Sequence, residues 1–448
     1  MTSLTAQLTR AVSSGQGVAA LSPIIESNKW VDMAQATVDM GATEFRCLID
    51  LLTSPCLSSL MADADRKTRQ RMADALTDHQ MLVILGSMQP DDAADVLGAL
   101  EPRRVGEILS QMREADRLVL ADLLRYPDET AGSIMTTSFL AVGEDGSVAD
   151  CLATLQAKGS KIEQIQTVYV TGADGRLVGY LDLRKILSSG RDESVASIMK
   201  TNIISVGPYD DQEEAARLVA RYDLNALPVV GGGRLLGVIT VDDIIDVIID
   251  EYDEDMLRLA GASREETLSS PLVTTIRMRL PWLLVNLLTA FLASLVVRLF
   301  EGTIEQVVAL SAIMTIVSGM GGNAGSQTMA IAVRHLSHEG LPAGELWHAL
   351  RKEVLAGAVD GLANGLVTGV VVTAIYGNPW LAVVVLAAMT GNMVIAGVSG
   401  LLVPVALRRC GQDPAVASSI FVTTATDVLG FLFFLGLAQA MLPLLSAG

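Results

Sequence analysis

The chain has 448 residues, half of them hydrophobic, yet its formal net charge is −18 and its mean hydropathy is +0.44. A single soluble globule does not combine these values, so we expect an acidic soluble part followed by an apolar membrane part, with the change near Ser270. The acidic excess argues against a nucleic-acid partner and is compatible with cation binding.

Two further features of the chain concern its compartment. The four cysteines lie far apart without metal-ligand spacing, which predicts reduced thiols in the cytoplasm. The first residues, MTSLTAQLTRAVSSG, lack the apolar core of a secretion signal.

Residues 1–130 are predicted to form an all-α bundle of short helices. Apolar residues recur at spacings of three and four from Met81 to Met112, and Pro90 and Pro102 stand where helices begin. Asp91 and Asp95 lie four residues apart and so share one helix face. This pair is either a favourable acidic first turn or part of a cation site.

Residues 131–245 contain an internal repeat of an α/β unit, with units at 131–195 and 196–245. GRLVGYLDLRKIL (175–187) in the first unit corresponds to GRLLGVITVDDII (233–245) in the second. The pair resembles a tandem CBS (Bateman) module, in which two units pack around a cleft. The resemblance implies nucleotide or ion sensing, with ATP as a candidate ligand of the cleft. A dimerisation domain without a ligand is the alternative.

An acidic linker helix is predicted over residues 246–270, continuing the helix that begins at Val241. At 100° per residue, Asp243, Asp246, Asp250 and Glu254 form one stripe. We expect the opposite, apolar face to pack against protein; it comprises Val241, Ile245, Ile248, Ile249, Tyr252 and Met256.

The charge of this region is strongly one-sided. Residues 201–270 contain 15 acidic and 5 basic side chains, a net of ten negative charges. The run is either a solvated face or a surface that binds divalent cations. Its helical order and its position before the membrane favour Mg²⁺ or Ca²⁺, which take oxygen ligands.

Residues 271–448 are predicted to form an α-helical membrane domain with five spans, each about the length needed to cross a bilayer. The spans are 281–300, 304–332, 354–375, 379–407 and 418–445. Arginine and lysine gather before span one, between spans two and three, and between spans four and five. The positive-inside rule therefore places the N-terminal domains in the cytoplasm and the C-terminus outside the cell membrane.

The last span carries one buried acid, Asp427, and otherwise no charge between Ser418 and Leu445. A carboxylate at that depth normally faces a bundle interior or a water-filled path. The alternative is a buried aspartate that is satisfied by Thr423, Thr424 or Thr426. Other spans carry amides and Asp360, and the GMGG stretch of span two is predicted to break its helix and to expose carbonyls.

With these pieces in order, the chain resembles the MgtE family of magnesium channels. The matching motifs are MQPDDAADVL, YPDETAGSIMTT, the two CBS units, ALSAIMTIVSGMGGNAGSQ, DGLANG and DPAVASSIFVTTATDVLG. The resemblance covers about residues 88–437, and the first eighty residues match only loosely. It implies a homodimer whose ion-selectivity site at the twofold axis contains Asp427.

The resemblance also implies roles for other residues. Cytosolic acids that bind regulatory Mg²⁺ are implied at Asp91, Asp95, Glu213, Asp223, Asp243, Asp246, Glu251, Glu254 and Asp255. Candidate pore-lining residues are Asn323, Gly325, Ser419, Thr423, Gly430 and Asn364, with Glu305 at the ion path's mouth. Two positions depart from the family pattern: Thr315 stands in place of proline, and Ser419 stands where some members have asparagine.

These observations predict a magnesium-selective channel for Mg²⁺ influx, closed by cytosolic Mg²⁺. The chain lacks a GxxxxGK[ST] motif, and we expect no enzyme activity. Its expected partners are divalent cations, membrane lipid and a second copy of the chain. One alternative is an ion-coupled secondary transporter that uses Asp360 and Asp427 as a relay. The other is a membrane-anchored CBS nucleotide sensor.

Overall fold

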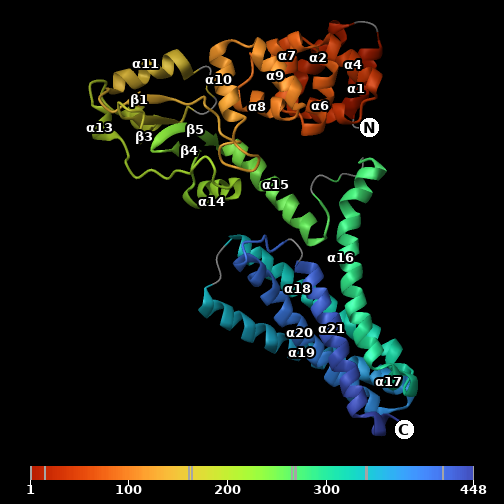
Figure 1. Ribbon diagram of the computed structural model, residues 1–448. Coiled ribbons are helices and arrows are strands. Elements are labelled where there is room, and N and C mark those ends of the chain that lie inside the picture. The colour runs from red at the N-terminus through yellow and green to blue at the C-terminus, as the bar shows by residue number, and fades with distance from the viewer. Residues whose placement is uncertain are drawn as a thin grey trace. The chain divides into compact units, whose positions relative to one another are not determined.

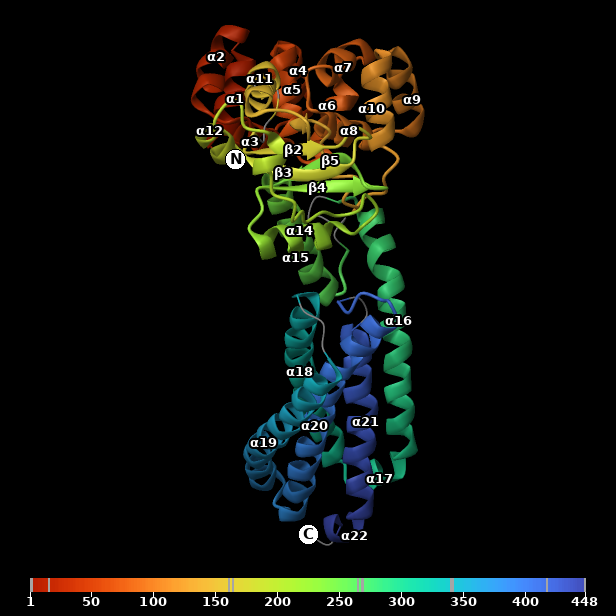
Figure 2. The same cartoon turned by 90° about the vertical axis from the view of Figure 1, so that its left-hand side faces the viewer.

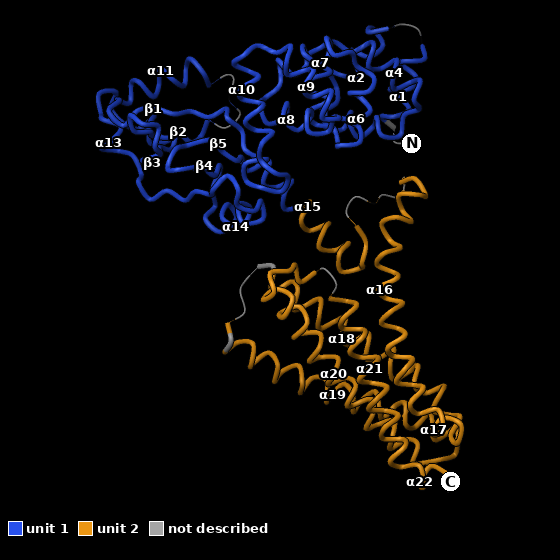
Figure 3. The backbone as a smooth tube through the Cα atoms, in the orientation of Figure 1, with its two compact units in different colours: residues 1–248 blue, residues 249–448 orange. Residues whose placement is uncertain are grey.

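The computed structural model describes residues 3–14, 17–159, 162, 165–263, 266, 270–338, 342–415 and 418–446. They form two compact units, residues 1–248 and residues 249–448, which Figure 3 shows in different colours. Residues 264, 265 and 267–269 of the predicted linker, and Val416 and Ala417 of the DPAVASSIF motif, lie outside the described residues.

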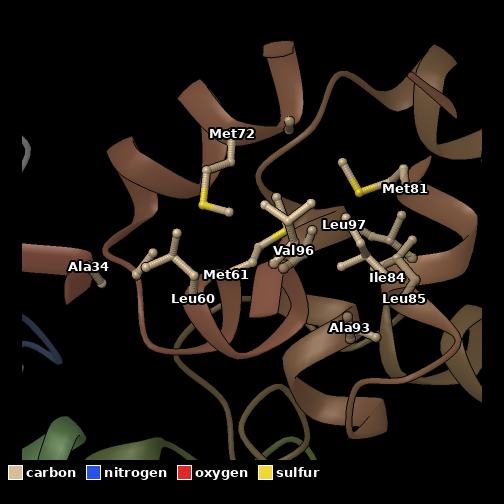
Figure 4. Packing of buried hydrophobic residues seen from close by; sticks show 14 of the residues in the cluster. Ala34, Leu60, Met61, Met72, Met81, Ile84, Leu85, Ala93, Val96 and Leu97 are labelled. Carbon is tan, nitrogen blue, oxygen red and sulfur yellow. The ribbon is translucent and has the colours of Figure 1, made fainter. Parts of the chain in front are cut away.

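In the part of the chain that the structure describes, the first unit begins with ten short helices, which confirms the predicted helical N-terminal domain. Proline opens α8 and α9, and a Thr77–Gln80 capping box opens α7, so local sequence sets where these helices begin. Methionine and aliphatic side chains from successive helices fill one continuous core (Figure 4). The helices are α1 (Ser3–Ser13), α2 (Val18–Ser27), α3 (Trp30–Val38), α4 (Ala42–Leu51), α5 (Ser54–Ala62), α6 (Arg66–Ala75), α7 (Asp78–Leu85), α8 (Pro90–Gly98), α9 (Pro102–Gln111) and α10 (Glu114–Leu123).

The repeat prediction is confirmed, because each CBS unit contains the same hairpin and helices (Figure 1). β2 pairs with β3 and β4 pairs with β5, both antiparallel, while β1 adds to β2 in parallel. Gly175 and Gly233 turn the two hairpins at φ of 79° and 83°, a region that favours glycine. The elements are β1 (Ala141–Gly143), α11 (Val148–Lys158), β2 (Thr167–Thr171), β3 (Leu177–Asp182), α12 (Leu183–Ser188), α13 (Val195–Ile198), α14 (Gln212–Tyr222), β4 (Ala226–Gly231) and β5 (Arg234–Thr240).

A strand bridge brings the start of the first CBS unit onto the sheet of the second. Thr136 pairs with Val238 of β5, through backbone hydrogen bonds of 2.8 and 2.9 Å. β5 continues without a break into α15 (Val241–Leu259). Thr136 therefore lies beside the point where the acidic helix begins.

The predicted apolar face of α15 is wrong for a single chain. Ile245, Tyr252 and Met256 are exposed, with Tyr252 at 74%, whereas Ile244 and Val247 lie in the core of the first unit. The helix leaves β5 directly after the buried Thr240, and this connection turns Ile244 and Val247 inward.

The second unit is α-helical. Among the described residues, four helices are long and apolar enough to cross a membrane: α16 (Leu272–Leu299), α19 (Ala343–Tyr376, apolar from Gly344), α20 (Pro379–Arg409) and α21 (Ser418–Ala440). The predicted second span instead comprises α17 (Glu301–Gln306) and the longer α18 (Ala309–His338), and α22 (Leu442–Leu445) follows α21. α18 has the length to cross a bilayer but contains polar and glycine residues, and it packs beside α20 and α21 (Figures 1 and 2).

The predicted break at the GMGG stretch is wrong, since α18 is continuous from Ala309 to His338. Glycines of the neighbouring helix α19 serve close packing instead. A Cβ at Gly361 of α19 would lie 2.4 Å from Cα of Thr390, and one at Gly357 would lie 2.7 Å from the carbonyl oxygen of Met393. Small residues thus let α19 and α20 approach backbone to backbone, as in many membrane bundles.

Candidate metal sites

The carboxylate of Asp427 lies inside the helical unit, on α21. It comes nine residues after Ser418, or about 14 Å along the helix. Its Oδ1 accepts a hydrogen bond of 2.5 Å from Oγ of Ser318 on α18, 109 residues earlier in the chain. Two helices that are distant in sequence therefore hold this carboxylate between them.

The alternative in which neighbouring threonines satisfy Asp427 is wrong. Thr423 donates to the carbonyl oxygen of Ser419 at 2.8 Å, and Thr426 donates to that of Thr423 at 2.9 Å. Thr424 likewise donates to the carbonyl oxygen of Ile420 at 2.6 Å. All three hydroxyls bond the backbone of their own helix, so the hydroxyl on Asp427 comes from α18.

The candidate pore-lining residues on α18 and α21 fall into two groups. Gly325 and Gly430 are buried at helix contacts; a Cβ at Gly325 would lie 2.7 Å from Val422 Cγ1. These glycines lie where neighbouring helices approach closely. Asn323 and Thr423 are exposed and Ser419 is half-buried, so these three remain accessible.

The remaining membrane candidates lie on helices other than α18 and α21. Asn364 is on α19, which packs mainly against α20, and its Nδ2 donates to the carbonyl oxygen of Asp360 at 2.8 Å. The side chain of Asp360 is exposed. Glu305 is exposed near the end of α17.

In the first unit, Asp91 of α8 and Asp243 of α15 face one another. Burial raises the pKa of Asp243 to about 7, against a hydrogen bond from Thr240 and with a smaller contribution from the negative charge of Asp91. Burial also raises the pKa of Asp91, against a hydrogen bond from Thr136. Oδ1 of Asp91 is buried without a hydrogen-bond partner among the described residues. This oxygen is suited to bind a cation or a proton.

Asp95, one turn after Asp91, is already paired. Its carboxylate lies 2.9 Å from Nη1 of Arg69, whose guanidinium also donates to the carbonyl oxygens of Met61 and Ala62. Arg69 is thus fixed to its own loop, and a cation at Asp95 would have to compete with it.

The structure separates the predicted acids of the second CBS unit. Glu213 lies in the first turn of α14, and Asp223 caps its C-terminus in the left-handed conformation, with φ of 52°. Ten residues of helix span about 15 Å, so these two cannot share one ion. Both side chains are exposed.

The acids of α15 differ in environment. Asp246 and Asp250 are exposed, Glu251 and Asp255 are half-buried, and Glu254 is buried. Glu254 forms an ion pair with Arg258, and Arg258 also pairs with Asp413, just before α21. Oδ1 of Asp413 accepts a hydrogen bond from the backbone N–H of Ala415 at 2.8 Å.

Within the ranges that the structure covers, no three His, Cys, Asp or Glu side chains converge closely enough to hold a metal ion. Among the predicted acids, Asp91 and Asp243 interact electrostatically, and burial raises the pKa of both. Sequence reasoning missed Ser318, Thr136, Arg69 and Arg258. The sequence signal for Ser318 was weak, because it is one of three hydroxyl residues in the mostly apolar stretch ALSAIMTIVSG.

The raised pKa of Asp243 predicts how the stability of the metal-free protein depends on pH. The folded state keeps a proton up to about pH 7, whereas the unfolded chain releases it near 3.8, so the free energy of unfolding should fall as pH rises between them. Asp243→Asn should therefore unfold less readily than wild type at pH 8, by up to about 4 kcal/mol, and similarly at pH 4. Thermal melts in chelator of a soluble fragment ending at residue 262 measure this, and equal pH dependence of both proteins would contradict it.

Family models match most of the chain. "Divalent cation transporter" (MgtE) matches residues 314–437, "MgtE intracellular N domain" matches residues 29–129, and "CBS domain" matches residues 131–192 and 195–250. The magnesium transporter MgtE of Bacillus subtilis is 30% identical over 94% of this chain and 93% of its own. Its namesake in Enterococcus faecalis is 36% identical over 71% of both chains, and that in Thermus thermophilus is 33% identical over 79% of both.

Two solved structures resemble the first unit. One is the soluble part of a magnesium transporter, 28% identical, with a TM-score of 0.50, covering 55% of this chain and 98% of that one. The other is the cytosolic domain of the Mg²⁺ channel MgtE in complex with ATP, 30% identical, with a TM-score of 0.51, covering 54% and 99%.

Proposed function

Because the chain belongs to the MgtE family of magnesium transporters, which are not enzymes, we propose that it is a homodimeric magnesium channel. It admits Mg²⁺ across the cell membrane and is closed by cytosolic Mg²⁺. The observation that carries the proposal is the carboxylate of Asp427, held between α18 and α21 by Ser318.

The chemistry of Mg²⁺ explains why one such carboxylate per chain suffices. Mg²⁺ gives up its water reluctantly, so a pore binds it with its hydration shell in place. A carboxylate within hydrocarbon is costly unless it serves a polar path, and Asp427 is the single acid of its span. Two copies of Asp427 around a twofold axis offer a dication two opposite charges.

Influx is driven by the membrane potential. A divalent ion that moves to the negative side gains about 2.3 kcal/mol per charge for each 100 mV. A passive pore therefore suffices, in keeping with the absence of an ATP-hydrolysis motif from the sequence.

Gating by cytosolic Mg²⁺ is supported by the buried pair Asp91 and Asp243. An ion bound there would give the unpartnered Oδ1 of Asp91 a ligand and cancel the repulsion between the two acids. It would also clamp α8 of the helical domain onto the start of α15. At its other end, α15 is tied through Arg258 to Asp413, next to the pore helix α21, which provides a path from sensor to pore.

ATP is the proposed second ligand, bound in the CBS cleft. The relative that was crystallised with ATP supports this, because its cytosolic domain is 30% identical to this chain with a TM-score of 0.51.

The proposed topology has the N-terminal unit in the cytoplasm and the C-terminus outside. In a cysteine-free background, Gly302→Cys and Ser446→Cys should react with an impermeant thiol reagent added to intact cells, whereas Ser337→Cys should react only after lysis. Labelling of Ser337→Cys from outside would refute five spans with this orientation. Ser188→Cys, at an exposed position within the first CBS unit, serves as the cytoplasmic control.

A further inference from the structure

The bond between Ser318 and Asp427 is unusual for a helical serine. Ser311 and Thr315 of the same helix bond their own backbone, at 2.7 Å to the carbonyl oxygen of Val308 and at 2.8 Å to that of Ala312. Thr328 donates to Oε2 of Glu353 on α19 at 3.0 Å, so it also bonds across helices, but to α19 and not to α21. Ser318 instead donates across to α21, at 2.5 Å.

A buried amide fixes the place where this bond forms. Asn392 of α20 is 1% exposed, and its Nδ2 donates at 2.8 Å to the carbonyl oxygen of Val317, the residue before Ser318. Its Oδ1 is buried without a hydrogen-bond partner among the described residues. A buried amide that lacks one of its hydrogen bonds lowers the stability of the fold, which indicates that Asn392 has a function at this position.

Glycines on both sides make room for this amide. A Cβ at Gly321 of α18 would lie 2.1 Å from Nδ2 of Asn392, and a Cβ at Gly430 of α21 would lie 2.4 Å from its Oδ1. Asn392 is therefore wedged between α18 and α21, one turn from Ser318 on one helix and one turn from Asp427 on the other. Its position sets how the two helices meet.

We propose that Ser318 is the positioning residue of the pore carboxylate, and that Asn392 holds α18 and α21 in the register that brings Ser318 to Asp427. The inference rests on the proposed function. Ser318 engages Oδ1 and orients Oδ2 toward the hydration shell of the passing ion. Mg²⁺ demands a regular octahedral shell whereas Ca²⁺ accepts six to eight ligands in flexible geometry, so a fixed carboxylate favours Mg²⁺.

The test uses the full-length protein in liposomes, with separate dye assays of Mg²⁺ and Ca²⁺ uptake. Ser318→Ala should raise the half-saturating Mg²⁺ concentration and lower the ratio of Mg²⁺ to Ca²⁺ uptake by about tenfold, the scale of one hydrogen bond to a charged group. Ser318→Thr, which keeps the hydroxyl, should restore the ratio. Ser311→Ala is the matched control on the same helix, and it should leave the ratio unchanged.

Asn392→Ala should also lower the ratio of Mg²⁺ to Ca²⁺ uptake. The double variant of Asn392→Ala and Ser318→Ala should lower this ratio no more than the stronger of the two single variants does, because both residues act through one bond. Ser318→Cys, a weaker donor, replaces Ser318→Ala if that variant fails to assemble. A wild-type ratio in Ser318→Ala, or in Ser318→Cys where that variant replaces it, would overturn the inference while leaving the proposed function intact. Magnesium uptake by Asp427→Ala would instead overturn the proposed function.

Discussion

Replacing Asp427 with alanine is expected to abolish Mg²⁺ uptake, lowering it at least a hundredfold while the protein still assembles. The change removes the only acid of α21 and leaves Ser318 without its acceptor across the helix contact. A hydrated dication would then cross the centre of the membrane without an opposite charge. Uptake into liposomes, together with rescue of a magnesium-requiring host, measures the effect.

Two variants separate a loss of charge from a loss of shape. Asp427→Asn keeps the size of the side chain and its ability to accept from Ser318, yet it should lose discrimination for divalent ions. Asp360→Asn removes an acid from another span, one that lies exposed on α19, and should retain most of the uptake. Full rescue of the host by Asp427→Ala at wild-type expression would refute the assignment.

The second large effect is expected from Asp91→Asn combined with Asp243→Asn, which should leave the channel open at high internal Mg²⁺. The two acids, on α8 and α15, interact electrostatically, so their neutral forms offer Mg²⁺ no charge to bridge. Moving the channel from 1% closed to 99% closed takes about 5.5 kcal/mol of differential Mg²⁺ binding between the two states. Several ions must supply this energy together, so the loss of one site should weaken closure. Uptake measured against internal Mg²⁺ gives the closing midpoint.

The opposite outcome is also informative. If these acids act mainly by repulsion, their neutralisation should lock the channel shut at every Mg²⁺ concentration; we expect them to act as ligands. Asp253→Asn, an exposed acid on the same helix, is the control and should keep the wild-type midpoint. A wild-type midpoint in the double variant would exclude this pair from gating and would leave the assignment of Asp427 untouched.

Much of the fold could be predicted because its signals are local. Proline and capping residues mark where the short helices begin, the GRL hairpins repeat in sequence, and long apolar runs mark the membrane helices. The two wrong predictions, a break at GMGG and an inward apolar face of α15, concern packing. In the GMGG stretch, Gly321 leaves room for the side chain of Asn392. The orientation of α15 follows from its direct connection to β5.

The candidate sites were only partly predictable, because their key contacts join distant residues. Asp427 stands out in the sequence as a lone acid, but its partner Ser318 is 109 residues away among many similar hydroxyls. Asp91 and Asp95 look equivalent in sequence. The fold pairs Asp95 with Arg69 and buries Asp91 against Asp243, 152 positions along the chain, so only one of the two offers a vacant oxygen.

A single measurement tests the central claim, that the chain is a magnesium channel, most directly. Purified protein is incorporated in a planar bilayer with Mg²⁺ as the only permeant cation, and Mg²⁺ is varied on the side of the N-terminal unit. The account predicts unitary current steps that disappear as this Mg²⁺ rises and that are absent from Asp427→Ala. Mg²⁺ transport by the same preparation in liposomes without any unitary steps would contradict it and would indicate a carrier.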